Sequence, residues 1–281
     1  MSAERMSLRE RADRLRALHQ GPDLLILVNA WDAASAAVVE AAGFPAVATS
    51  SAGVAFSLGV PDGQVLTRDE MLAAVGRIAR TVRVPVTADV EAGYGTDANA
   101  AAATAQALLA ADAAGMNLED YTDAGARLFA LELQVERIRA IREVGAAAGV
   151  HIVINARTDV YQAAEVPADR KLAETVRRGN AYLAAGADCV FVPFLYDGPT
   201  IGTLARELAG PLNILAVPTA PPLAELARLG VRRVSLGSGP MRAAMGRLRR
   251  IAQELKAGGS YTSFTEDAIP YAEMQKLVEE R

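Results

Sequence analysis

The sequence predicts an α/β protein of the (β/α)8 TIM-barrel type, with additional helices at its N- and C-terminal ends. Short apolar runs alternate with alanine-rich or amphipathic segments eight times along the 281 residues. Polar residues follow most of these apolar runs, and no G-x-G-x-x-G turn follows the first of them. A dinucleotide-binding sheet usually carries such a turn, so the doubly wound fold is the second choice. Residues 1–281 are therefore interpreted as a single barrel domain.

The elements follow in order from cap residues and apolar spacing. Residues 1–22 hold a first helix, for which Ser7 is the expected N-cap and Leu15 one of the apolar positions. Thr67 and Asp97 begin later helices. The eight expected strands cover residues 24–28, 46–49, 84–88, 116–120, 150–154, 189–193, 213–217 and 233–237. The helices between them cover residues 33–42, 67–82, 97–114, 131–148, 168–185, 200–208 and 222–229.

Residues 240–281 are expected to form a helical extension beyond the barrel. A basic amphipathic helix is predicted over 241–255, and a second helical segment over 264–280. Glycines at 258 and 259 separate the two. This extension either packs on its own barrel or is exchanged between subunits.

The clearest chemical signal lies in residues 84–95, an apolar run that ends in two carboxylates. Asp89 and Glu91 are two positions apart at the end of the expected strand, so both side chains point the same way. Two acids that face one spot repel each other unless a cation lies between them. Mg²⁺, which prefers one or two carboxylates plus waters, is such a cation. The alternative is a strand that simply ends in a polar loop.

Five predicted strands end in polar residues, and this pattern favours the metal site over the polar loop. In a (β/α)8 barrel the active site lies at the carboxyl ends of the strands. Acids scattered by chance would lie on helix surfaces instead. The strand-end residues are Asn29 and Asp32, Ser50 and Ser51, Asp89 and Glu91, Glu119 and Asp120, and Arg157 and Asp159.

Composition narrows the class of protein. The formal net charge of −4 argues against a nucleic-acid partner. No apolar run has the length of a membrane span, and the N-terminus lacks the apolar centre of a signal peptide, so a cytoplasmic protein without a membrane partner is expected. Cys189 is the single cysteine, which excludes an intramolecular disulfide, and we interpret it as a small buried hydrophobic residue. Neither His19 nor His151 is placed for catalysis.

Several motifs occur together in an order that resembles the isocitrate lyase/phosphoenolpyruvate mutase superfamily. The resemblance extends from about residue 24 to about residue 239, and it implies a (β/α)8 barrel that acts on small 2-oxo or 2-hydroxy carboxylic acids. It also implies dependence on Mg²⁺, with Mn²⁺ as the alternative ion, and a homotetramer built from dimers that exchange a C-terminal helix. The motifs are Asn29–Ala36, Ser50–Ala52, Leu58–Asp62, Ala88–Gly95, Asn117–Asp120 and Asn155–Asp159.

The same resemblance implies roles for individual residues. Asp89 would bind Mg²⁺ most directly, and Arg157 would clamp the carboxylate or carbonyl oxygens of the substrate. Simpler roles stay open, because Asp62 could only initiate a turn, Glu119 could cap the next helix and Arg157 could form a structural ion pair. Metal contacts through water are implied for Asp62, Glu91 and Glu119, and substrate contacts for Trp31, Asp32, Ser50, Ser51 and Ala52.

The segment after the fourth strand bears on which bond the protein breaks. Isocitrate and methylisocitrate lyases carry a Lys-Lys-Cys-Gly-His lid segment there, and phosphoenolpyruvate mutases follow Glu-Asp with a lysine and an asparagine. Residues 121–128 match neither pattern. Tyr94 and Tyr121 are therefore the candidates for the general acid or base.

The expected function is a Mg²⁺-dependent carbon–carbon lyase of the methylisocitrate lyase or oxaloacetate type. Cleavage beside a 2-oxo acid leaves an enolate, and a metal together with the Arg157 cation would stabilise its charge. Phosphorus–carbon chemistry, as in phosphoenolpyruvate mutase or phosphonopyruvate hydrolase, needs the same charge stabilisation and is the first alternative. A barrel that binds a carboxylate without turning it over is the second.

Overall fold

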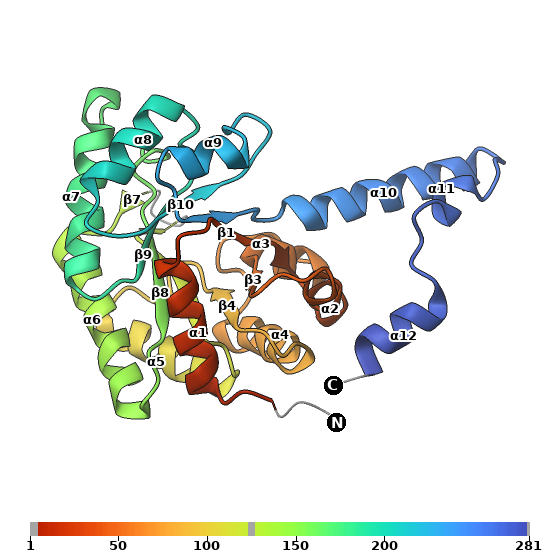
Figure 1. Cartoon of the computed structure of the whole chain (residues 1–281), viewed down its shortest axis with the longest axis horizontal. Helices are drawn as coiled ribbons and strands as arrows, with labels where there is room; N and C mark the ends of the chain where they lie inside the picture. Colours follow the sequence, from red (N-terminus) through yellow and green to blue (C-terminus); the bar gives the residue numbers. More distant parts are fainter. Residues whose placement is uncertain (1–4, 123–126, 280–281) are drawn as a thin grey trace.

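A computed structural model describes residues 5–122 and 127–279 as a nearly closed barrel of parallel strands (Figure 1). Nine strands form one sheet in the order β1-β11-β10-β9-β8-β5-β4-β3-β2, and every pairing in it is parallel. The (β/α)8 prediction is thereby confirmed. The strands are β1 (Leu25–Leu27), β2 (Asn29–Ala30), β3 (Val47–Thr49), β4 (Val86–Asp89), β5 (Gly115–Glu119), β8 (Val153–Arg157), β9 (Cys189–Val192), β10 (Leu212–Leu215) and β11 (Arg233–Ser235).

The first predicted strand, residues 24–28, is confirmed as β1, which pairs with β11, whereas the short strand β2 that follows it and pairs with β3 was not predicted. The side chain of Asn29, the first residue of β2, connects β3 to the segment that follows β11. Its Nδ2 donates to Thr49 O at 2.7 Å, and its Oδ1 accepts the N–H groups of Leu236 and Gly237 at 2.8 and 2.9 Å. The bent pair β1–β2 thus closes the barrel.

Helices surround the barrel, and several begin at the predicted caps (Figure 1). The side chains of Ser7, Thr67 and Asp97 accept N–H groups at the starts of α1, α4 and α5, which confirms these three caps. The helices of the barrel are α1 (Leu8–Gln20), α2 (Ala33–Ala41), α3 (Ser51–Ser57), α4 (Arg68–Thr81), α5 (Ala98–Ala110), α6 (Leu131–Ala148), the 3₁₀ helix η1 (Ala168–Arg170), α7 (Lys171–Ala184), α8 (Gly198–Glu207) and α9 (Leu223–Arg228). No helix within the described ranges has both the length and the apolar character needed to cross a membrane.

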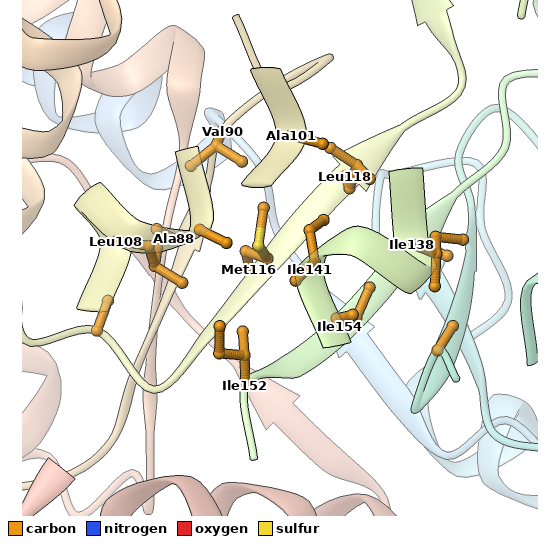
Figure 2. Close-up of a cluster of buried hydrophobic side chains, with 14 of the residues drawn as sticks. Ala88, Val90, Ala101, Leu108, Met116, Leu118, Ile138, Ile141, Ile152 and Ile154 are labelled. Carbon is orange, nitrogen blue, oxygen red and sulfur yellow. The ribbon is translucent and has the colours of Figure 1, made fainter. Parts of the chain in front are cut away.

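Alternation along the strands decides which side chains enter the barrel. Met116 and Leu118 of β5 pack outward in a cluster with Ile154 of β8 and with apolar residues of α5 and α6 (Figure 2). Their neighbours Asn117 and Asn155 therefore face the interior, where Asn155 Nδ2 donates to Asn117 Oδ1 at 2.8 Å. The same alternation turns the last residues of these strands toward the barrel mouth.

The fifth predicted strand, residues 150–154, lies three residues too early. Gly149 adopts a left-handed conformation with φ 67°, and Val150 N donates back to Gly145 O at 2.9 Å. Residues 150–152 therefore complete the end of α6, and β8 begins at Val153. The shift makes Arg157 the last residue of the strand. His151 lies at the amino end of β8, opposite the barrel mouth, where its Nε2 is 2.6 Å from Asp188 Oδ1.

The C-terminal extension departs from the barrel as a long arm (Figure 1). The arm consists of α10 (Gly239–Lys256), α11 (Thr262–Thr265) and α12 (Tyr271–Glu279), so the predicted segment 264–280 is two helices and not one. Asp267 has a φ of 58°, and Pro270 cannot continue a helix, which separates α11 from α12. α12 turns back and contacts α2.

Arg233, a buried cation inside the barrel, contacts the first helix, α1. Arg233 is fully buried, its Nη2 donates to Asn117 Oδ1 at 3.2 Å, and its Nη1 is 3.2 Å from His19 Nε2. His19 Nδ1 lies 2.8 Å from Leu15 O. Burial and the charge of Arg233 lower the pKa of His19 to about 4. A neutral imidazole thus fastens α1 to the closed end of the barrel.

This histidine gives a prediction for stability against pH. Because the folded state resists protonation of His19, the unfolded chain binds more protons between about pH 6.5 and pH 4. The contribution of His19 to the free energy of unfolding is complete above pH 6.5 and falls by about 3 kcal/mol as the pH decreases to 4. Urea unfolding at several pH values should show this loss in the wild type and not in His19→Gln. Parallel curves for the two proteins would contradict it.

Candidate active site

Three strand ends place two acids and one arginine at the same mouth of the barrel. Asp89 ends β4, Glu119 ends β5 and Arg157 ends β8, and these strands are neighbours in the sheet. The register aligns Glu119 with Arg157 and Asp89 with Asn117. Since Asp89, Glu119 and Arg157 each stand two positions after an inward-facing residue, all three side chains face the interior of the mouth.

Arg157 is held by two carboxylates. Its Nε and Nη2 donate to Asp159 at 2.8 to 3.1 Å, and its Nη1 lies 2.7 Å from Glu119 Oε2. Its guanidinium also lies 5.9 Å from the centre of the Phe191 ring. Nε and Nη2 thus form hydrogen bonds with Asp159, Nη1 forms an ion pair with Glu119, and the remaining two N–H groups have no partner among the described residues. Arg157 therefore has both the structural ion pair and the spare donors that a substrate clamp needs.

The turn after β4 is shaped by left-handed residues. Glu91, Gly93 and Tyr94 have φ values of 52°, 82° and 57°, a conformation that costs a residue other than glycine on the order of 1 kcal/mol. Gln64 holds the turn in place, because its N–H donates to Glu91 Oε2 at 2.5 Å and its Oε1 accepts the N–H of Tyr94 at 2.9 Å. Uncommon backbone of this kind is concentrated at functional sites.

Asp62 reaches the same mouth from the loop between α3 and α4. The Ser51 hydroxyl bonds to Asp62, and the Ser51 N–H donates to Asp89 Oδ2 at 3.1 Å, so one serine links the two acids. Asp89 N in turn donates to Thr49 Oγ1 at 2.9 Å. The structure thus brings together all four predicted metal residues, Asp62, Asp89, Glu91 and Glu119.

Burial and neighbouring acids raise the pKa values of Glu119 and Asp62 at the mouth. Burial raises the pKa of Glu119 well above its usual range, Arg157 opposes this, and the charges of Asp159, Asp89 and Glu91 raise it further. The pKa of Asp62 is raised by desolvation and then by Asp89. Burial works against the charged form of Arg157, but Glu119 and Asp159 outweigh it and raise the pKa of the guanidinium. One arginine therefore faces an excess of carboxylates.

A divalent cation fits this donor set. The site offers hard carboxylate oxygens that repel one another, and Glu119 Oε2 accepts no aligned hydrogen bond from the described residues. Among the same residues, no three acids are close enough together to hold an ion directly. Mg²⁺ commonly takes one or two protein carboxylates and completes its octahedron with water. This donor set is compatible with one direct carboxylate ligand and further contacts through water.

Comparison with known proteins identifies the family. The family model for phosphoenolpyruvate phosphomutase matches residues 15–256. The chain belongs to the phosphoenolpyruvate phosphomutase family. Its members include enzymes on both sides of the carbon–carbon and phosphorus–carbon alternative, and the barrel and the resemblance inferred from the motifs are confirmed.

Individual members of the family show the range of activities. A 2-methylisocitrate lyase of Halalkalibacterium halodurans is 29% identical over 97% of this chain and 91% of its own. An oxaloacetate decarboxylase of Rhodopseudomonas palustris is 30% identical over 98% of this chain and 96% of its own. The solved structure of a 2,3-dimethylmalate lyase has a TM-score of 0.83 with 27% identity, and it covers 95% of this chain and 94% of its own. The protein is therefore an enzyme of this superfamily.

Several of the residues predicted to bind substrate have groups that already have partners. Asp32 is the N-cap of α2 and accepts Ser35 N at 2.7 Å, and Trp31 N donates to Ser35 Oγ at 3.1 Å. Ser50 is the N-cap of α3 and accepts Gly53 N at 3.2 Å. Ser51 and Ala52 form the first turn of α3, whose N-terminus therefore points to the mouth that holds Asp89.

The candidate acids and bases differ in their surroundings. Tyr94 is half-buried, its hydroxyl lies 3.4 Å from Glu91 Oε1, and burial followed by the charges of Glu91 and Asp89 raises its pKa. Tyr94 is thus a phenol that keeps its proton. Tyr121 is half-buried in the hairpin of β6 (Tyr121–Thr122) and β7 (Arg127–Leu128). Residues 123–126 of the predicted lid lie outside the described residues.

Two other polar side chains have structural surroundings. Cys189 is fully buried in β9, and burial raises the pKa of its thiol to about 12, which confirms the sequence interpretation. Asp120 is fully buried and accepts Tyr182 Oη at 2.6 Å, Thr158 Oγ1 at 2.8 Å and Asp159 N at 3.0 Å. Both residues stabilise the barrel wall rather than face the mouth.

Sequence reasoning missed residues that support the site. Thr49 and Gln64 contact Asp89, Glu91 and Tyr94, yet neither belongs to a motif with a chemical signal. Gln64 lies in a loop whose path cannot be derived from spacing. Arg137 of α6 was also missed, because an arginine in a helical pattern is usually interpreted as a solvated position.

Proposed function

We propose that this enzyme is a Mg²⁺-dependent lyase that cleaves a carbon–carbon bond of a small 2-oxo or 2-hydroxy di- or tricarboxylate. The observation that carries the proposal is the pairing of the acid cluster with Arg157, whose guanidinium has two N–H groups to spare. An anionic substrate with vicinal oxygens complements such a mouth. The acids would bind the divalent cation, the cation would bind the substrate oxygens, and Arg157 would attract the substrate directly.

Asp89 would hold the Mg²⁺, with Asp62, Glu91 and Glu119 bound to it through water. When bound, the ion would supply a Lewis acid that polarises the carboxylate and carbonyl oxygens of the substrate. Mn²⁺, which accepts the same oxygen ligands, would support the same role. Asp89 is the residue of choice because Ser51 and Thr49 fix it from two sides.

The chain's own residues account for the rest of the chemistry. Cleavage beside a 2-oxo acid leaves an enolate, and Arg157 places a permanent positive charge next to its oxygens. Glu119 and Asp159 prevent the guanidinium from rotating away. Tyr94 keeps its proton, so its hydroxyl would donate a hydrogen bond to the enolate oxygen rather than act as a base. Half-buried Tyr121, which follows the carboxyl end of β5, would be the second candidate acid or base.

A substrate screen tests the proposal. Oxaloacetate, 2-methylisocitrate, isocitrate, substituted malates and phosphonopyruvate would be offered with Mg²⁺, with Mn²⁺ and with EDTA. We expect release of pyruvate or glyoxylate from at least one of the first four compounds and a return to the background rate with EDTA, measured by coupled dehydrogenase assays. Metal-independent turnover, or turnover of phosphonopyruvate alone, would overturn the carbon–carbon assignment.

Phosphorus–carbon cleavage is the second candidate, and the match of the phosphoenolpyruvate phosphomutase model over residues 15–256 favours it. This reaction also passes through a pyruvate enolate, so the same acids and Arg157 would serve it. ³¹P NMR of phosphonopyruvate incubated with the enzyme distinguishes the two candidates, since a phosphonate signal would convert to phosphate or a phosphate ester.

The exposed apolar side chains of the C-terminal arm favour a homotetramer in which 240–281 is exchanged between subunits, and the contact of α12 with α2 of the same chain represents the alternative packing. Apolar side chains along it are exposed, with Leu248 56%, Tyr261 69% and Tyr271 81% accessible, although α10 is amphipathic and would normally bury such a face. We expect light scattering to give a concentration-independent tetramer for the full chain and a smaller species for Leu248→Glu. A monomer at every concentration would contradict this prediction.

A further inference from the structure

Arg137 is a fully buried cation that pairs with no carboxylate among the described residues. It projects from α6 behind the strand ends of β4 and β5. Its Nη1 donates to Gln134 Oε1 at 2.6 Å, and its Nε has no partner within the described chain. Burial lowers the pKa of its guanidinium to about 10. Burying a charged guanidinium without a carboxylate partner costs free energy, so its position between helix and barrel calls for an explanation.

The contacts of Nη2 supply the reason. It donates to Ala92 O and, at 3.2 Å, to Gly95 O, so it binds two carbonyls of the turn that carries Glu91 and Tyr94. Thr104 Oγ1 of α5 donates to Gly93 O at 2.8 Å, between the two. A turn with several left-handed residues does not hold its own shape, and the carbonyl groups of such a turn are its natural points of attachment.

Arg137 also contacts the other side of the mouth. Its guanidinium lies over the Phe129 ring, 4.5 Å from the ring centre. Phe129 N donates to Asp120 O at 2.7 Å, next to Glu119. One side chain therefore attaches both to the turn after β4 and to the segment that follows β5. The fit is close, because a Cβ on Gly93 would lie 3.1 Å from Arg137 Nη2 and 2.9 Å from Leu118 Cδ1.

From these contacts we infer that Arg137 is a positioning residue, which holds Glu91 and Tyr94 in the geometry that the divalent cation and substrate require. The inference rests on the proposed function, because it assigns Arg137 to the support of that metal site. Stability alone does not explain this arginine, since a well-packed apolar side chain in a buried position often stabilises a protein as well or better. Groups that orient metal ligands typically change metal affinity by about 10 to 100-fold when they are replaced.

The test measures Mn²⁺ affinity directly, by the loss of the free-ion EPR signal, in the full-length enzyme well below its unfolding temperature. We expect the Mn²⁺ Kd to rise at least about 10-fold in Arg137→Met. Arg137→Lys keeps the charge and can bind one carbonyl, so an intermediate Kd is expected. If Arg137→Met does not fold, Arg137→Lys carries the test. With the best substrate of the screen, kcat/KM should fall in the same order.

Arg11→Met is the matched control. Arg11 is likewise a buried arginine, but it pairs with Asp112 at the closed end of the barrel, so its loss should lower the unfolding temperature and leave the Mn²⁺ Kd unchanged. Wild-type Mn²⁺ binding in the folded Arg137 variants would overturn the inference and leave the proposed function intact. Absence of Mn²⁺ binding by the wild type would instead reject the metal site itself, and the role of Arg137 with it.

Discussion

Asp89→Asn is expected to abolish divalent-metal binding and to lower kcat/KM at least about 10³-fold, or about 4 kcal/mol. Asparagine has the shape of aspartate and keeps an oxygen that can accept the Ser51 N–H, so the fold should be preserved. What is lost is the negative charge at the one predicted direct ligand. Isothermal titration with Mg²⁺ and Mn²⁺ and the coupled assay would measure the two effects.

A second signature separates this result from simple unfolding. Because Asp89 raises the pKa values of both Asp62 and Glu119, its removal relieves repulsion in the metal-free enzyme. The metal-free unfolding temperature of Asp89→Asn should therefore equal or exceed that of the wild type, whereas the increase on adding Mg²⁺ should disappear. Asp13→Asn, an exposed aspartate of α1, is the charge-matched control. Retained metal-dependent turnover in Asp89→Asn would exclude Asp89 as the principal ligand.

The barrel and the position of its mouth could be predicted because they depend on local patterns. Apolar runs of strand length, cap residues such as Thr67 and polar strand ends such as Asp89 each have a short-range physical cause. The parallel register then brings the strand ends together without further information. Asp89, Glu119 and Arg157 share one mouth for this reason, whereas Asp62 and Glu91 reach it from a loop and a turn.

The differences arise where a distant contact decides the local structure. The unpredicted strand β2 begins at Asn29, whose side chain bonds to residues of β3 and of the segment after β11, and no residue near it in the sequence indicates these contacts. The support of the site is similarly distant, since Gln64 holds Glu91 across 27 positions and Arg137 holds Ala92 across 45. Spacing rules can place ligands on strands, but they cannot identify the side chains that orient them.

The acids and Arg157 explain why one mouth serves several reactions of the family. They supply charge stabilisation to any enolate, whether a carbon or a phosphorus substituent leaves. Selection between these reactions must come from groups that contact the leaving part, and Tyr94 and Tyr121 are the candidates at the mouth. Variants of the acids should therefore affect all substrates of the screen alike, whereas tyrosine variants should change their order.

Arg157 is the residue for which a conservative change should be most costly. Arg157→Lys keeps the charge, but a lysine cannot contact Glu119, Asp159 and a substrate oxygen at once. We expect kcat/KM to fall about 10² to 10³-fold. Arg157→Met would in addition leave two buried acids without their cation, and the free energy of unfolding should decrease by about 3 to 5 kcal/mol.

Arg142→Lys separates the loss of a substrate contact from the loss of an ion pair. Arg142 is 19% exposed against 21% for Arg157, and it pairs with Asp188 at the closed end of the barrel. Replacing it should reduce stability without changing kcat/KM, as measured by urea unfolding and the coupled assay. If Arg157→Lys behaves in the same way, the guanidinium of Arg157 serves only to hold Glu119 and Asp159, and its role as a substrate clamp is rejected. A fall in kcat/KM that occurs in Arg157→Lys but not in Arg142→Lys would show that the remaining N–H groups of Arg157 take part in catalysis.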